Sequence, residues 1–309
     1  MSALTISTQL NPLGKSTLKV SPIAYGMWRF GGTDVKTAQE KIEVALGAGI
    51  NLFDQADVYG VDGGGAFGDS EKLFGEVLQA SPTLREKMVI ASKGGIVLGV
   101  PYDSSADYLK RACEASLQRM QLETIDLYQI HRPDFLGHPA EIAAALTELR
   151  SSGKIREVGV SNYTPSQFRA LQAHLDFPIA THQPEFSCLH YAPLKDGILD
   201  QCLEYSVTPL AWSPMAGGRL GWSVEEAQAQ GADRVAALLG ELDGVAQEQG
   251  VSRSAVALAW LMVHPAKVIP IIGTQTCSRI VESMQALKVQ LTRAEWNRIL
   301  EASMGESLP

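Results

Sequence analysis

The feature that most constrains this chain is a regular alternation of short apolar runs with segments whose apolar residues recur at helical spacing. The predicted strands cover residues 21–26, 50–53, 88–92, 125–130, 158–160, 179–181, 209–212 and 268–272. Eight strand–helix units are what a closed parallel (β/α)8 barrel requires, so we predict an α/β fold of the TIM-barrel type. A doubly wound parallel sheet is the structural competitor, but it usually contains fewer strands.

Helical patterns and capping residues separate these strands. The predicted helices cover residues 34–48, 71–79 with Ser70 as the cap, 106–120, 139–152, 164–174, 199–205, 234–249 and 254–263, with two more beginning at Arg279 and Thr292. A weak alternation over residues 4–20 predicts a small N-terminal β-hairpin, with its turn at Pro12 to Gly14. No shift in composition marks a boundary, so residues 1–309 are expected to form one domain with extra C-terminal helices.

Composition excludes several classes of partner. The 309 residues carry a net charge of -8, which argues against a nucleic-acid surface. No apolar run approaches the roughly 20 residues of a membrane span, and the first residues do not resemble a signal peptide. The four cysteines show no metal-ligand spacing, so we expect no metal and free thiols in a reducing cytoplasm.

Three consecutive predicted strands end on a titratable residue: Asp54, Lys93 and His131. Tyr59 follows Asp54 after one short loop. Each residue alone has an ordinary structural explanation, such as a loop cap or a charge at the rim. Because the chemistry of α/β barrels lies at the carboxyl ends of the strands, the four side chains together are expected to converge on one mouth.

Such a set of groups suits proton transfer to a carbonyl oxygen. A free phenol has a pKa near 10 and donates a proton poorly at neutral pH unless its anion is stabilised. We expect the Lys93 ammonium to stabilise the Tyr59 phenolate, and Asp54 to hold Lys93 by an ion pair. His131 is expected to donate a hydrogen bond to the substrate oxygen. No side chain supplies a hydride, so a nicotinamide or a flavin is needed.

The residues that carry these groups also match a known family. The stretch 49–60, GINLFDQADVYG, followed by EKLFG at 71–75, resembles the first signature of the aldo-keto reductases, and the likeness extends over nearly the whole chain. The chain is most similar to bacterial members with a short C-terminal tail. The resemblance implies NADPH-dependent reduction of aldehydes or ketones, with Asp54, Tyr59, Lys93 and His131 as the catalytic residues and Tyr59 as the general acid.

The resemblance also implies a set of cofactor contacts. The expected NADPH ligands are Met27 and Asp54, then Ser161, Asn162 and Gln183 at the nicotinamide amide, Trp212 stacked on its ring, Ser213, Met215, Gly217 and Gly218 around the pyrophosphate, Thr274 and Arg279 at the 2′-phosphate, and Glu282 and Ser283 near the adenine. Two departures from the family pattern matter, and the loss of one cation weakens the case for strict NADPH preference. Gly273 stands where many members have lysine, and Ser283 stands where many have asparagine.

The substrate pocket is expected to include Trp28, Tyr59, His131 and Arg132. The segment 63–68 matches G-x-G-x-x-G, but it follows a turn, so we interpret it as a flexible active-site loop. The chain ends soon after the last predicted helix, and we therefore expect no long C-terminal loop over the pocket and a broad preference for small carbonyl compounds. A monomer or a weak homo-oligomer is expected.

Two other functions stay open from the sequence. Some relatives of this family bind NADPH tightly and act as regulatory or sensor subunits with little turnover. A barrel lyase or isomerase that uses Lys93 as a Schiff-base amine is a weaker alternative.

Overall fold

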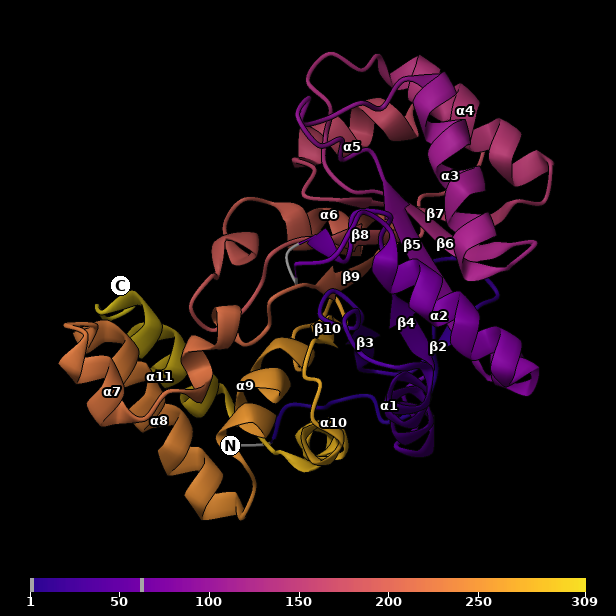
Figure 1. Cartoon of the computed structure of the whole chain (residues 1–309). Coiled ribbons are helices and arrows are strands. Elements are labelled where there is room, and N and C mark those ends of the chain that lie inside the picture. Colours follow the sequence, from indigo (N-terminus) through magenta and orange to yellow (C-terminus); the bar gives the residue numbers. More distant parts are fainter. Residues whose placement is uncertain (1–2, 62–63) are drawn as a thin grey trace.

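The eight parallel strands of the structure, a computed structural model, close into the barrel that the alternation predicts (Figure 1). The strands are β3 (Ala24–Gly26), β4 (Leu52–Asp54), β5 (Val89–Gly94), β6 (Ile125–Ile130), β7 (Ile155–Ser161), β8 (Thr181–Gln183), β9 (Thr208–Ala211) and β10 (Ile269–Ile272). Each pairs with the next, and β10 pairs with β3. The structure describes residues 3–61 and 64–309. Gly63, the first residue of the predicted loop, lies outside the described residues, as do Met1 and Ser2.

Helices connect the strands and surround them. They are α1 (Val35–Gly47), α2 (Asp69–Ala80), α3 (Ala106–Met120), α4 (Pro139–Ser151), α5 (Pro165–Gln172), α6 (Ile198–Tyr205), α9 (Arg253–Met262) and α10 (Cys277–Ser283). Short 3₁₀ turns add η2 (Pro82–Lys87), η3 (Ala192–Leu194), η4 (Ala216–Gly221) and η5 (Met284–Lys288). None of the helices in the described part of the chain combines the length and apolar character that a membrane span needs.

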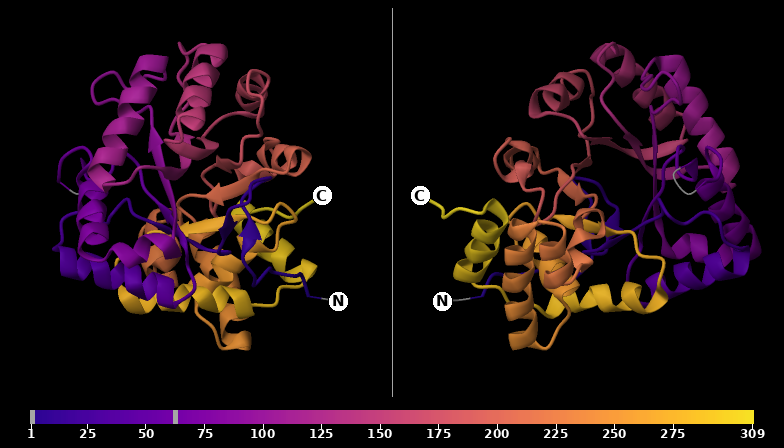
Figure 2. Two further views of the ribbon diagram at one scale, coloured as in Figure 1. Left: turned by 90° about the vertical axis from the view of Figure 1, so that its right-hand side faces the viewer. Right: turned by 60° about the vertical axis from the view of Figure 1, so that its left-hand side comes forward.

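A second group of helices extends the barrel near the C-terminus. It contains α7 (Val224–Ala229), α8 (Asp233–Gln249) and α11 (Arg293–Met304), in which α8 packs against both others. Figure 2 shows these orange and yellow helices side by side, away from the magenta helices of the middle of the chain. The extra C-terminal helices that the sequence predicts are therefore present.

The N-terminal hairpin closes the barrel at the amino ends of its strands. Its strands are β1 (Asn11–Pro12) and β2 (Lys19–Val20), so the predicted hairpin is present, but its turn begins one residue later than expected. Pro12 belongs to the first strand, and the reversal runs through residues 13–18, where the Leu13 amide bonds to the Leu18 carbonyl. Leu13 and Val20 pack into the apolar cluster inside the barrel. The place left for a site is therefore the other end of the barrel, where the strands have their carboxyl ends.

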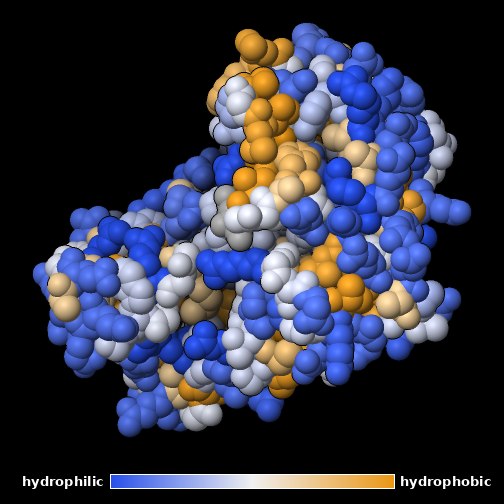
Figure 3. All heavy atoms as spheres, in the orientation of Figure 1, coloured by the Kyte–Doolittle hydropathy of each residue, from blue (hydrophilic) through white to orange (hydrophobic). Residues whose placement is uncertain are grey.

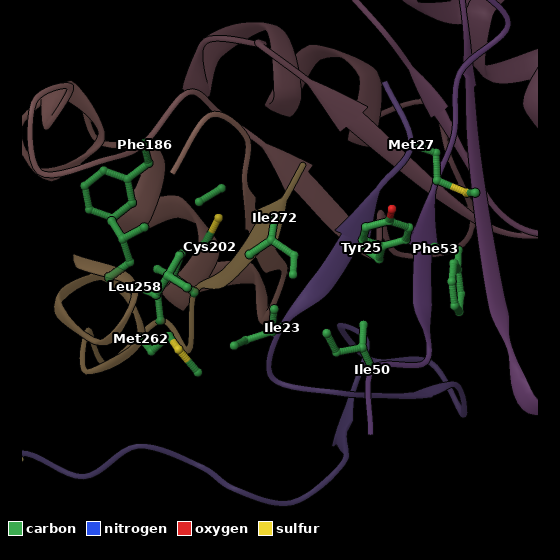
Figure 4. Packing of buried hydrophobic residues seen from close by; sticks show 14 of the residues in the cluster. Ile23, Tyr25, Met27, Ile50, Phe53, Phe186, Cys202, Leu258, Met262 and Ile272 are labelled. Atoms are coloured by element: carbon green, nitrogen blue, oxygen red, sulfur yellow. The ribbon is translucent and has the colours of Figure 1, made fainter. Parts of the chain in front are cut away.

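Two apolar layers hold the barrel. The inner cluster contains inward residues such as Leu52, Ala91 and Leu127, and the outer cluster fills the space between the strands and the helices. Figure 4 shows part of the outer cluster, where Tyr25 and Phe53 lie next to each other on β3 and β4. Their ring centroids are 6.0 Å apart in an edge-to-face arrangement. Alternate residues of one strand therefore face different layers, as the period of two requires.

Several predicted boundaries differ from the structure by a few residues, and two of these differences have a tertiary cause. The sixth barrel strand is Thr181–Gln183 rather than 179–181, because its pairing follows β7, where Ser161 lies opposite Gln183, and not the apolar run before it. Helix α2 begins after Gly68 rather than after Ser70. The Ser70 hydroxyl instead donates to the Met27 carbonyl oxygen, 2.9 Å away, and is buried. Tertiary contacts outweigh local propensity at both places.

Candidate active site

The centre of the candidate site is the Lys93 ammonium at the carboxyl end of β5. Its Nζ atom donates to Asp54 Oδ2 at 2.7 Å, to the Gln55 carbonyl oxygen at 2.9 Å and to Tyr59 Oη at 2.9 Å. An ammonium has three hydrogens, so every donor is used. Lys93 is fully buried and Asp54 is 2% exposed, which makes this pair a desolvated ion pair held by additional hydrogen bonds.

The second Asp54 oxygen accepts from two amides that lie on other strands. Gln183 Nε2 on β8 is 3.0 Å from Asp54 Oδ1, and Gln129 Nε2 on β6 is 3.3 Å from it. Gln129 was missed by the sequence analysis. The signal was available, because Gln129 is a polar residue in a buried strand and lies two positions before His131, on the same face.

A glycine gives this network its space. Gly159 on β7 lies opposite Gln129 and Thr181 in the strand register. A Cβ atom there would lie 2.0 Å from Thr181 Oγ1 and 2.8 Å from Gln129 Cγ. The Thr181 hydroxyl donates to Gln129 Oε1 at 3.1 Å. The missing side chain of Gly159 therefore permits the contact that orients Gln129 toward Asp54.

The start of α2 holds the loop that carries Tyr59. The Ser70 amide donates to the Tyr59 carbonyl oxygen at 3.2 Å, and the Tyr59 amide closes a turn with the Ala56 carbonyl at 3.1 Å. Ser70 also exchanges hydrogen bonds with Gln55, the residue whose carbonyl accepts from Lys93. The phenol and the ammonium are thus positioned by the same short segment.

His131 completes the predicted group of four. Its ring meets the Tyr59 ring edge to face, with centroids 5.9 Å apart and an angle of 82° between planes. Burial, with smaller contributions from the Lys93 and Arg132 charges, lowers the pKa of His131 well below its usual value. The imidazole is therefore neutral at pH 7 and carries one N–H donor.

Burial and charge act in opposite directions on the other two groups. Burial raises the pKa of Tyr59, and the Lys93 ammonium opposes this increase. Burial alone would lower the pKa of Lys93, but Asp54 and Tyr59 together raise it. At neutral pH the site thus holds a charged amine and a protonated phenol. A charged amine with all its hydrogens donated disfavours the Schiff-base alternative, which needs a free amine.

The residues expected at the nicotinamide form a second bonded cluster beside this one. The Ser161 hydroxyl donates to the Gln183 carbonyl oxygen at 2.9 Å. Asn162, with a left-handed φ of 59°, donates through its side chain to the His131 carbonyl oxygen and accepts from Trp212 Nε1 at 2.9 Å. The indole is thereby fixed, and the Arg132 guanidinium lies 5.5 Å from its ring centroid.

The segment after β9 forms a tight loop with open backbone. Ser213 and Ala216 have left-handed φ angles of 53° and 52°, and Gly217 and Gly218 have φ angles of 67° and 98°. Both glycines are exposed, and a Cβ at either would meet nothing within 4 Å. The Ser213 hydroxyl accepts from the Gly217 amide at 2.9 Å. Met215 is partly buried at the base of this loop.

The third group of expected cofactor residues lies after β10. Thr274 and Glu282 are half-buried and Arg279 is exposed on α10. The Thr274 hydroxyl accepts from the Thr276 amide at 3.2 Å, which tightens the loop before the helix. Ser283 is buried, and its hydroxyl donates to the Ile280 carbonyl oxygen, so its side chain points into the fold.

The mouth of the barrel combines polar groups with an apolar rim. Met27 is buried with its amide bonded to the Asp54 carbonyl, whereas Trp28 is 42% exposed. Four exposed apolar side chains in the loops after β5 and β6 were missed by the sequence analysis: Leu98, Val100, Phe135 and Leu136. Figure 3 shows apolar surface over these loops at the top of the molecule. Apolar side chains thus lie beside the polar groups at the carboxyl end of the barrel.

The fold and these clusters define a class, an α/β-barrel protein with titratable groups gathered at the carboxyl ends of its strands. The model of the "Aldo/keto reductase family" matches residues 22–303, and the chain belongs to this family. It is thus an oxidoreductase of the kind that reduces small carbonyl compounds with a nicotinamide cofactor.

Individual relatives agree with this assignment. A 6-dehydroglucose reductase of Novosphingobium aromaticivorans is 50% identical over 100% of both chains, and one of Agrobacterium fabrum is 38% identical over 94% of this chain and 97% of its own. Oxidoreductase YdhF of Escherichia coli is 37% identical over 94% of this chain and 95% of its own. The thermostable aldo-keto reductase Tm1743, solved with the inhibitor epalrestat, shares the fold with a TM-score of 0.78 and 24% identity over 95% of this chain and 99% of its own.

Proposed function

We propose that the protein reduces the aldehyde group of a small hydroxylated compound to an alcohol, using NADPH as the hydride donor and Tyr59 as the general acid. The observation that carries this proposal is the use of all three Lys93 donors, one of which bonds to Tyr59 Oη at 2.9 Å. Because the phenol oxygen accepts this bond, its own O–H is available to donate to a substrate oxygen.

The proton step follows from this geometry. Tyr59 gives its proton to the carbonyl oxygen, and the phenolate that remains is stabilised by the hydrogen bond from Lys93. Asp54 keeps Lys93 in place and charged. The neutral His131 imidazole donates a hydrogen bond that orients the carbonyl oxygen. NADPH, when bound, supplies the hydride that completes the reduction.

The described residues fit a nicotinamide cofactor in three places. Trp212 presents a planar ring that is fixed by its hydrogen bond to Asn162. Asn162, Ser161 and Gln183 form a chain of hydrogen bonds with amide and hydroxyl groups. The open backbone at Gly217 and Gly218 allows close approach of phosphate. Ser213, Met215 and Met27 complete this lining in the proposal. Thr274 and Arg279 would bind the 2′-phosphate, with Glu282 toward the adenine, and Ser283 would support this turn of α10 through its bond to Ile280.

The substrate class rests on the relatives. Two of them are 6-dehydroglucose reductases, and we propose a sugar aldehyde of this type as the substrate. Arg132 lies beside the candidate site, and its guanidinium, packed over Trp212, offers hydrogen-bond donors to substrate hydroxyl groups. Trp28 would form the outer wall of this pocket.

The test combines a substrate panel with a matched pair of variants. We expect purified protein to oxidise NADPH in the presence of 6-dehydroglucose faster than with unsubstituted alkyl aldehydes. Tyr59→Phe should lower kcat by about 10²- to 10⁴-fold while NADPH still quenches the tryptophan fluorescence. Tyr205→Phe is the control, since Tyr205 ends α6 just before the amino end of β9, at the opposite end of the barrel from the candidate site.

Unchanged turnover in Tyr59→Phe would refute the role of Tyr59. Tight NADPH binding without turnover of any carbonyl compound would instead favour the regulatory function.

A further inference from the structure

A cation from the first barrel helix reaches the loop that precedes α10. Lys41 lies on α1, and its Nζ atom donates to Gln275 Oε1 at 3.2 Å, although the two residues are 234 positions apart. Helices α1 and α10 pack against each other across the seam where β10 meets β3 (Figure 1). The contact therefore joins the first and last strand–helix units of the barrel.

Gln275 holds Lys41 at a defined place in this loop. Its Nε2 atom donates to the Gly273 carbonyl oxygen at 3.5 Å, and its side chain also lies near the buried Tyr25 phenol, where it opposes the effect of burial on the pKa of Tyr25. Gln275 follows Thr274 directly and precedes Arg279 on α10. The Lys41 ammonium is thus bound to the segment that connects the two residues proposed for the 2′-phosphate.

The charge of this cation is not neutralised by the protein. Over residues 3–61 and 64–309, no carboxylate lies within 4.0 Å of Lys41 or of Arg279, whereas eight other lysine and arginine side chains have such a partner. Most lysines and arginines in these two ranges also lack such a partner, so what sets Lys41 apart is its hydrogen bond to the loop before α10. Lys41 is half-buried, and its bond to Gln275 leaves two ammonium hydrogens for a ligand.

We propose that Lys41 is a specificity-determining residue that contacts the 2′-phosphate of NADPH together with Arg279 and Thr274. The inference rests on the proposed use of NADPH and assigns to α1 a role that no sequence motif indicates. Lys41 would supply, from another helix, the cation that Gly273 does not provide. A lysine offers a compact positive charge with rotatable donors, which suits a phosphate at the edge of a cleft.

The test measures binding rather than turnover. Dissociation constants are determined by calorimetry for NADPH and NADH, and for their adenosine halves, adenosine 2′,5′-bisphosphate and adenosine 5′-monophosphate. We expect Lys41→Met to weaken NADPH and the bisphosphate by roughly tenfold and to leave NADH and the monophosphate within about twofold, since a hydrogen bond between charged groups is lost. Lys41→Arg should retain most of the preference.

The control is Lys36→Met, because Lys36 is an exposed lysine on the same helix. Lys36→Met should leave the affinity for NADPH and for NADH unchanged. The melting temperature of every variant shows whether the fold is kept. If Lys41→Met weakens the four ligands equally, or weakens none of them, the role of Lys41 is refuted while the NADPH preference of the unchanged protein still stands. If the unchanged protein binds NADH as tightly as NADPH, both the proposed cofactor and the proposed role of Lys41 are refuted.

Discussion

Charged side chains have opposite surroundings in two parts of the molecule. Inside the barrel, Asp54 and Lys93 are buried and every donor of the ammonium is bonded within the protein. Beside α10, Arg279 is exposed, Lys41 has Gln275 as its hydrogen-bond partner, and neither cation has an acidic partner in the described part of the chain. The first region satisfies its own charges, and we propose that the second leaves them for a ligand.

The difference follows from what each region is proposed to do. A proton transfer requires donors and acceptors at fixed distances, and burial strengthens their electrostatic interactions. Recognition of a phosphate requires available charges, and such charges are tolerated only where solvent reaches them. The same residue type, lysine, therefore contributes to geometry in one region and to affinity in the other.

The largest expected difference between the two regions is in how far stability falls when a lysine is replaced by methionine. Lys93→Met leaves the Asp54 carboxylate buried without its cation, and we expect a loss of about 3–5 kcal/mol in the free energy of unfolding. Lys41→Met removes a half-buried charge without an acidic partner, and its effect is expected to stay within about 0.5 kcal/mol. Urea denaturation of both variants gives the two values. Similar losses would show that the regions do not differ.

A pair of glycines tests the packing of the two regions. In Gly159→Ala the new methyl group would meet Thr181 Oγ1 at 2.0 Å, and we expect destabilisation of about 1–3 kcal/mol together with reduced activity. In Gly273→Ala the methyl group meets nothing within 4 Å, so stability should hardly change. Thermal unfolding of the two variants gives the comparison. A neutral Gly159→Ala would contradict the role given to this glycine.

Burial of histidine inside the fold predicts a dependence of stability on pH. Burial lowers the pKa of His182 to about 4, from an ordinary value near 6.5, and lowers the pKa of His131 in the same direction. Between the folded-state pKa of His182, about 4, and its unfolded-state value near 6.5, the unfolded chain binds more protons than the folded protein. Stability therefore falls as the pH decreases through this range. From pH 7 to pH 5.5 we expect a loss of about 1 kcal/mol from His182.

His182→Gln should make the pH profile flatter by that amount, and His174→Gln, at an exposed position, should leave it unchanged. Denaturant titrations at both pH values provide the measurement. If His182→Gln keeps the full slope, the pH dependence comes from another group.

Much of the candidate site was predictable from the sequence because an α/β barrel links position along a strand to position in space. Asp54, Lys93 and His131 follow apolar runs, and the inward faces of their strands change from apolar to polar toward the carboxyl end. A local pattern is enough to find such residues. The structure confirms the barrel, and it brings the predicted carboxylate, amine and phenol within hydrogen-bond distance.

The order of strands and helices and the residues on which the strands end follow from the sequence alone, since both depend on neighbours a few positions apart. The fold in three dimensions was needed to show which strands supply Gln129 and Thr181 to the network, why position 159 requires glycine, and how Lys41 reaches Gln275. These contacts join distant parts of the chain when the barrel closes. No local periodicity encodes them, because their geometry depends on the register between strands and on the packing of the first helix against the last.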